Sequence, residues 1–236
     1  MSPGSRRTAE AGGMADGMWR RFGTLVREKL FLSLVLSTGF WLAYGVLSRV
    51  PPGPVRTVPR TPLDSWTPSG TAGWGWIYLS PFLLSGLLPW LIDRRDHLRA
   101  YVRCFLALSL PAFVCFALFP VASPRGTLDP GAGPVSWVRW ADGPYNAFPS
   151  LHAGFLVLLG GLAARMVEFS RRSLPLRVGL GALYLAWSAA VLAATLATGQ
   201  HWVLDLVAGL ALGFAAHGWA WRGVTCSDAE TPGTPG

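Results

Sequence analysis

Residues 178–221 read VGLGALYLAWSAAVLAATLATGQHWVLDLVAGLALGFAAHGWAW, two long apolar runs joined by a short polar stretch that contains His201. An apolar run of about 20 residues is long enough to cross a membrane as an α-helix. Asp205 follows His201 by four residues, at the start of the second run. Ionisable side chains at membrane depth are energetically costly, so they mark functional sites. The stretch therefore predicts two consecutive membrane helices with a site where the second one begins.

The same pattern of apolar runs extends over most of the chain. Runs of membrane length occupy residues 30–48, 74–92, 104–123, 151–169, 178–198 and 201–221. The sequence is 51% hydrophobic and only 14% charged, whereas about 25% of the residues in a soluble domain are charged. We therefore predict an all-α fold, an integral membrane bundle of six transmembrane helices.

The segments at the two ends differ in composition from the bundle. Residues 1–27 are rich in Gly, Ser, Ala and Arg, and residues 223–236 end in Thr-Pro-Gly-Thr-Pro-Gly. Sequences of this kind bury too little apolar surface to fold. We predict a disordered cytoplasmic tail at 1–27, one membrane domain at 28–222 and a second disordered tail at 223–236. The first apolar run lacks a cleavage site and is expected to be a retained helix.

The basic residues orient the predicted bundle. They gather in the N-terminal tail and in the loops after the second and fourth helices, and they are absent from the loop after the fifth. Because positively charged loops remain in the cytoplasm, both termini are expected to be cytoplasmic. The formal net charge of +8 is then explained by basic residues that flank membrane helices and set their orientation. No nucleic-acid partner is expected. In this orientation His152, His201 and Asp205 all lie at the extracytoplasmic face.

His201 and Asp205 form the first candidate pair. A separation of four residues puts both on one helical face, with about 5–6 Å between their Cβ atoms. The carboxylate can accept a hydrogen bond from one ring nitrogen and leave the lone pair of the other free to attack, as in a Ser-His-Asp triad. The alternatives are a polar pair that closes a helix end and a metal site, although zinc needs more ligands than this pair supplies. The cysteines show no spacing typical of a zinc site or of a disulfide framework.

His152 follows Pro149-Ser150-Leu151 at the start of the fourth predicted helix. Ser150 is placed to cap this helix, and a helix N-terminus attracts phosphate oxygens. His152 is then able to protonate a leaving oxygen, unless it only faces the membrane interface. Arg125, at the outer end of the third helix, is a candidate cation for an anionic substrate or an ordinary interfacial arginine.

Two segments together resemble the PAP2 superfamily of lipid phosphate phosphatases. PSLHAG at 149–154 is similar to the second motif of the family, and GQHWVLDLVAG at 199–209 is similar to the third. The leucine before His152 resembles the branch that contains inositol-phosphorylceramide synthases. The motifs cover roughly residues 150–154 and 198–209, and the six-helix pattern extends the resemblance over 30–221.

The resemblance implies a role for each candidate residue. His201 would be the nucleophile, Asp205 its orienting partner and His152 the general acid, while Ser150 would bind phosphate. The chain departs from the family at its first motif, Lys-x6-Arg-Pro, which is missing, and at the Ser-Arg that often opens the third. We assign phosphate binding to Arg125 in their place.

These residues predict a metal-independent membrane phosphatase of lipid phosphate monoesters or diphosphates, such as phosphatidate or polyprenyl phosphates, with a phosphohistidine intermediate. Its partners would be the lipid phosphate substrate and membrane lipids, without a cofactor. It would be a multi-pass protein of the plasma membrane, with its active site on the extracytoplasmic face. One alternative is a lipid phosphotransferase that moves a phosphoryl or phospho-headgroup to an alcohol. A distant alternative is a haem-binding electron carrier, in which Asp205 would have no purpose.

Overall fold

The computed structural model describes residues 19, 21–66, 73–125, 134–166 and 173–224. Within these ranges the regular elements are helices, which confirms the all-α class. The α-helices are α2 (Val26–Leu47), α3 (Trp74–Leu87), α4 (Arg95–Leu118), α5 (Pro134–Ala141), α6 (Leu151–Arg165), α8 (Leu174–Ala197) and α9 (Val203–Ala220), and short 3₁₀ helices are η1 (Pro62–Trp66) and η2 (Leu88–Leu91). The predicted tails at 1–27 and 223–236 lie mostly outside the described residues.

Each of the six predicted apolar runs contains a helix. The helices α2, α4, α8 and α9 are long and apolar enough to cross a membrane by length and composition. The helix α6 is apolar but has only 15 residues, and α3 continues directly into η2. The largest boundary difference is in α4, which starts at Arg95 instead of 104. The first turns of α4 contain charged residues. Because an apolar run in the sequence marks only the apolar part of a helix, it does not include these turns.

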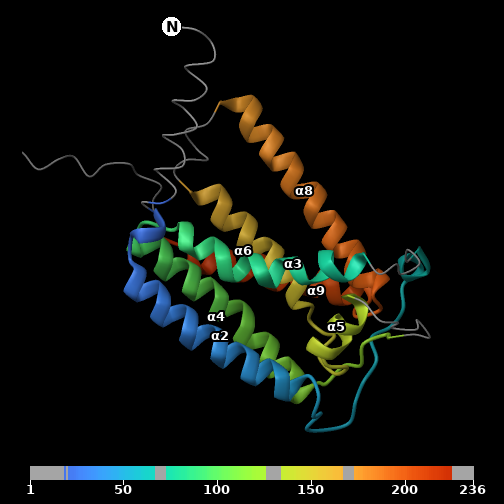
Figure 1. The fold of residues 1–236 in the computed structure, drawn as a ribbon. Coiled ribbons are helices and arrows are strands. Elements are labelled where there is room, and N and C mark those ends of the chain that lie inside the picture. Colours follow the sequence, from blue (N-terminus) through green and yellow to red (C-terminus); the bar gives the residue numbers. More distant parts are fainter. Residues whose placement is uncertain (1–18, 20, 67–72, 126–133, 167–172, 225–236) are drawn as a thin grey trace, which may run out of the picture.

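The helices α6 and α9 pack against each other at the centre of the bundle (Figure 1). Helix α4 contacts both of them, α3 lies between α6 and α8, and α2 runs along α4. Four phenylalanines join these layers, with ring centroids 5.3–6.1 Å apart; they are Phe40 of α2, Phe82 of α3, Phe105 of α4 and Phe155 of α6. Tilted and edge-on aromatic pairs at this spacing are favourable beyond the area they bury.

Glycines allow α6 and α9 to approach closely. A Cβ atom on Gly209 would lie 2.1 Å from the carbonyl oxygen of Ser150, and a Cβ atom on Gly213 would lie 3.0 Å from that of Gly154. Small residues four apart are typical of close helix contacts in membranes. The contact also joins the two motifs, because the Ser150 N–H donates to the Asp205 carbonyl oxygen at 3.0 Å.

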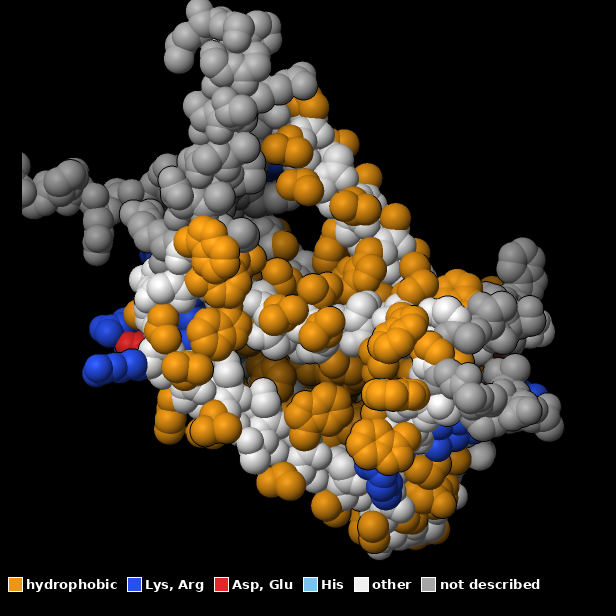
Figure 2. Space-filling view, viewed as in Figure 1, with side chains coloured by type: hydrophobic (Ala, Val, Ile, Leu, Met, Phe, Trp, Pro, Cys, Tyr) orange, Lys and Arg blue, Asp and Glu red, His pale blue; other side chains and the backbone are white. Residues whose placement is uncertain are grey.

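The outward faces of α2 and α8 are apolar. The leucines Leu34, Leu183 and Leu185 each expose 68–69% of their surface. Figure 2 shows hydrophobic side chains spread over the long helices, with Lys and Arg concentrated near their ends. An apolar surface of this extent is unusual for a soluble monomer. Together with the helix lengths, it is typical of an integral membrane protein.

The connections at the end where α6 and α9 begin are tied to one another by backbone hydrogen bonds. The Arg56 N–H donates to the Pro120 carbonyl at 2.9 Å, and the Ala147 N–H donates to that of Val121 at 3.1 Å. The proline-rich segment 51–61 contains no helix, as its composition predicts. The short helix α5 lies in the third connection. These segments form the rim on which the candidate residues converge.

Candidate active site

The N-terminus of α6 has the cap that its sequence predicts. Phe148 precedes a proline and is therefore kept out of the helical region, so the helix starts only after Ser150. Ser150 has an extended backbone (φ −68°, ψ 113°), and its Oγ accepts a hydrogen bond from the Ala153 N–H at 3.5 Å. His152 consequently lies in the first turn of α6.

His152 is buried against three other rings. Its side chain is only 1% exposed. Its ring centroid lies 3.9 Å from that of Tyr78, 4.5 Å from that of Phe82 and 5.7 Å from that of His201. Its Nε2 atom has no hydrogen-bond partner among the described residues. A buried polar atom without a partner is destabilising, so this nitrogen is available to a bound ligand.

His201 lies in the turn between α8 and α9. Gly199, two residues earlier, has φ +66°, a left-handed conformation that glycine adopts without strain. The His201 Nδ1 atom lies 2.8 Å from the carbonyl oxygen of Ala147. Because a carbonyl oxygen can only accept, this contact assigns the proton to Nδ1 and the free lone pair to Nε2.

Asp205 is close to His201, but its geometry differs from the prediction. Helix α9 begins at Val203, so His201 precedes the helix and the two side chains do not share a helical face. The Asp205 Oδ2 atom lies 3.8 Å from His201 Nδ1, beyond hydrogen-bond distance. It accepts instead from the Trp202 N–H at 2.7 Å. Asp205 thus closes the helix end, and the carbonyl of Ala147 makes the hydrogen bond that was predicted for the carboxylate.

Arg125 reaches the same site from the connection after α4. Its Nε and Nη2 atoms each lie 3.3 Å from Oε1 of Gln200, the residue before His201. Its Nη2 atom also donates to the backbone carbonyl of Asp142. Burial lowers the pKa of Arg125, and the negative charge of Asp142 opposes this shift. Arginine nevertheless remains protonated in proteins, so a cation lies beside Gln200, the residue before the nucleophile candidate.

Asp142 was not identified as a site residue from the sequence. It is 4% exposed, and its carboxylate accepts hydrogen bonds from Tyr44 Oη at 2.6 Å, Asn146 Nδ2 at 2.7 Å and Tyr78 Oη. Because the Tyr78 ring also packs on His152, Asp142 holds one wall of the histidine pocket in place. Its only signal in the sequence is an acidic residue ten positions before His152.

Asp142, His152 and His201 each offer one metal-ligating atom, and these three atoms lie within 4.8 Å of one another. Two imidazoles and a carboxylate are a ligand set that zinc accepts. However, both carboxylate oxygens already accept hydrogen bonds from neutral donors. A metal ion bound by Asp142 would have to displace one of these donors.

Asp64 of η1 anchors the start of α9. Its Oδ1 atom accepts from the Val203 N–H at 2.8 Å, and its Oδ2 atom accepts from the Thr61 N–H at 2.6 Å. A carboxylate at a helix N-terminus satisfies a free N–H and interacts favourably with the helix dipole. The first connection is thereby fixed to the segment that positions His201.

Replacing Asp64 by alanine should lower the free energy of unfolding by about 1–2 kcal/mol at neutral pH, because two partly buried N–H groups lose their acceptor. Burial raises the pKa of Asp64, but hydrogen bonds from Thr61 and Val203 bring it below the usual value of 3.8. The stabilisation is therefore fully present above that value and lost as the pH falls through the folded-state pKa. Thermal unfolding of both proteins from neutral pH into the acidic range measures this. Equal unfolding midpoints at neutral pH would contradict it.

The geometry brings all five predicted site residues to one end of the bundle. Comparison with known families gives an independent result. The model of a family described as the PAP2 superfamily matches residues 72–219, more than half of the 236 residues. The matched range contains both histidines. No curated protein and no solved structure gives a significant match.

Proposed function

The chain belongs to the PAP2 superfamily, and on that premise we propose that it is a membrane phosphatase of lipid phosphate monoesters or diphosphates that acts through a phosphohistidine. Family membership indicates phosphatase or phosphotransferase chemistry. The observation that carries the proposal is the pair of buried imidazoles 5.7 Å apart, between centroids. This spacing allows both rings to contact one phosphate group.

The proposed reaction has two steps. In the first, Nε2 of His201 attacks phosphorus, the bond to the leaving oxygen breaks, and protonated His152 gives its proton to that oxygen. In the second, neutral His152 removes a proton from water, and the resulting hydroxide displaces His201 from phosphorus and releases phosphate. Splitting the transfer in this way replaces one difficult step by two easier ones. The hydrogen bond from Nδ1 to Ala147 supports His201 as the nucleophile, because it leaves the lone pair on Nε2.

The charge of the transferred phosphoryl group needs donors around it. Ser150 Oγ and the guanidinium of Arg125 are the donors that we assign to its oxygens, together with the N-terminus of α6. The Asp205 carboxylate, 3.8 Å from Nδ1 of His201, stabilises the positive charge that the ring gains after attack.

We further propose that all six apolar helices cross the plasma membrane, with both termini in the cytoplasm and the site on the extracytoplasmic face. The distribution of basic residues supports this orientation. At the opposite end of the bundle, Lys29 donates to the carbonyls of Arg21 and Trp90 at 2.8 Å, and Arg95 pairs with Glu28 at 2.7 Å. This charged end is the expected cytoplasmic surface.

One experiment tests reaction, metal independence and orientation together. Intact cells that express the chain should release phosphate from an externally added, membrane-impermeant lipid phosphate analogue, and EDTA should not reduce the rate. Cells that express His201→Ala provide the background. Activity only after lysis would invert the orientation. Loss of activity in EDTA with recovery on adding zinc would assign the cluster of Asp142, His152 and His201 to a metal instead.

A phosphotransferase would use the same site with an alcohol in place of water. Adding long-chain alcohols to the purified protein distinguishes the two reactions. A phosphatase releases phosphate at an unchanged rate, whereas a transferase forms a new phosphoester and releases less phosphate.

A further inference from the structure

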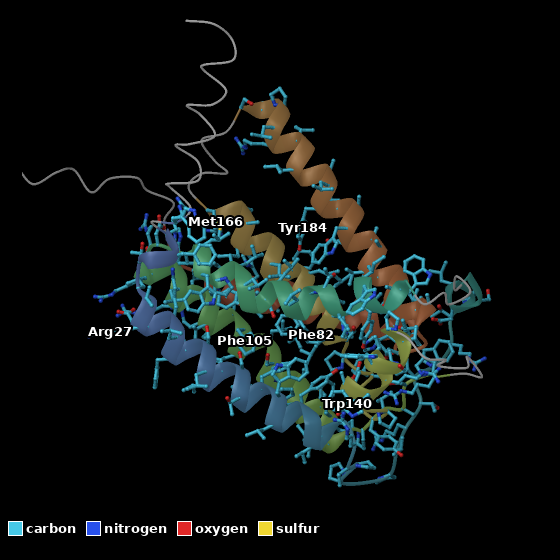
Figure 3. The ribbon with its side chains drawn as sticks, viewed as in Figure 1. Arg27, Phe82, Phe105, Trp140, Met166 and Tyr184 are labelled. Carbon is cyan, nitrogen blue, oxygen red and sulfur yellow. The ribbon has the colours of Figure 1, made fainter. Side chains whose placement is uncertain are left out.

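A largely apolar cleft lies between α2, α3 and α4. Leu32, Leu36 and Phe40 of α2 form one wall, and Phe82 and Phe105 line the other sides. Figure 3 shows Phe82 and Phe105 between α2 and α3, and Figure 2 shows the surface hollowed in the same region. The cleft opens on the apolar outer surface of the bundle, so its natural contents are hydrocarbon.

The cleft ends beside the candidate active site. Phe82 lines it, and the ring of Phe82 lies 4.5 Å from that of His152, between centroids. Phe155, which also lines the cleft, follows His152 by three residues on α6 and packs 5.3 Å from Phe82. Two phenylalanines thus form the boundary between the apolar cleft and the imidazole.

From the level of His152 the cleft runs toward the charged end of the bundle. Its lining on α2 extends from Phe40 to Lys29, which corresponds to about 16 Å along the helix axis. Lys29 belongs to the charged end of the bundle, opposite the histidines. A phosphate held at His152 therefore has its hydrocarbon chain directed into the cleft and away from the rim.

We propose that this cleft binds one long hydrocarbon chain of the phosphoester substrate and so selects long-chain lipid phosphates over short-chain phosphate esters. The proposal rests on the proposed function, because it places the reacting phosphate at His152. A second apolar cavity, between α3, α6 and α8, is lined by residues such as Leu159, Tyr184 and Trp187. Among the described residues its aromatic lining residues, Tyr184 and Trp187, make a ring contact with each other and none with the rings around His152, so it does not carry the same argument.

Gly86 allows the cleft to be filled without disturbing its walls. It lines the cleft, and a Cβ atom added there has no other atom within 4 Å. We expect Gly86→Ala, Gly86→Leu and Gly86→Phe to reduce kcat/KM for hexadecyl phosphate progressively. The phenylalanine variant should lose on the order of tenfold or more, because each buried methylene group contributes about fourfold in affinity. Hydrolysis of butyl phosphate, which is too short to enter the cleft, should change less than about twofold by the same argument.

The matched control is Gly39→Phe. Gly39 lies on α2, also has no atom within 4 Å of an added Cβ, and does not line the cleft. This variant should hydrolyse both esters as the wild type does. Ser37→Phe, on the opposite wall, provides a second way to fill the cleft if the Gly86 variants do not fold.

The assay uses the full chain in phosphatidylcholine vesicles with both alkyl phosphates and with farnesyl phosphate. If folded variants lose the same fraction of kcat/KM for short and long esters, or lose none for either, the cleft is not a chain site. Phosphate release by the wild type would still support the phosphatase in that case. If neither ester is hydrolysed by the wild type, the proposed function itself is wrong. Loss with hexadecyl but not farnesyl phosphate would restrict the site to straight chains, which supports the proposal in a narrower form.

Discussion

Replacing His201 by alanine should reduce phosphate release from a lipid phosphate by about 10⁴-fold or more, the size of loss seen when the nucleophile of a covalent catalyst is removed. The reason is that Nε2 of His201 is the atom to which we assign the attack on phosphorus. Nδ1 of His201 donates to Ala147 at 2.8 Å, so Nε2 alone is able to attack. Steady-state kinetics of the purified variant measure the loss.

The matched control for this variant is His217→Ala. His217 lies on α9, the helix that follows His201. Its ring packs on Trp221, with 5.8 Å between centroids. This variant loses a histidine of the same bundle but should keep its activity. A His201→Ala protein that folds and retains wild-type activity would refute the assignment of the nucleophile.

Replacing His152 by alanine should have the second largest effect, and the effect should depend on the leaving group. A general acid contributes about 10²–10⁴-fold when the leaving oxygen needs a proton. Hydrolysis of alkyl phosphates should fall by this amount. The first step with p-nitrophenyl phosphate should fall much less, because nitrophenolate leaves without protonation. Burst measurements of nitrophenol release separate the first step from the second.

The comparison between leaving groups also distinguishes catalysis from packing. His152 contacts Tyr78 and Phe82, so its removal leaves a cavity that could loosen the pocket. A loosened pocket would slow both substrates to the same extent. Equal losses for alkyl and nitrophenyl esters would therefore contradict a role for His152 as proton donor.

Most of the helical fold was predictable, because membrane helices need long uninterrupted apolar runs. Each of the six runs contains a helix, although α4 begins earlier than its run. Charged turns that extend a helix beyond the apolar region carry no hydropathy signal. The short helix α5 was likewise missed, because eight residues are too few to show a clear period.

The site was predictable where residues close in sequence act together, and less so where distant segments meet. The Ser150 cap follows from local preferences and is present. The hydrogen bond between His201 and Asp205 was predicted on the assumption that α9 includes His201. The helix in fact starts two residues after His201. The carbonyl of Ala147, from another connection, accepts the hydrogen bond from His201 Nδ1 instead. Asp142 was missed for the same reason, because its partners Tyr44 and Tyr78 come from α2 and α3.

Trapping the covalent species is the most direct test of the central claim, which is that His201 carries the phosphoryl group. The His152→Ala protein should be mixed with radiolabelled p-nitrophenyl phosphate and quenched in base, which preserves phosphohistidine. Attack proceeds in this variant while the second step lacks its base, so the label should accumulate on the peptide that contains His201 and be absent after the further change His201→Ala. A nitrophenol burst without any protein-bound phosphate, or label that persists in the double variant, would contradict the account.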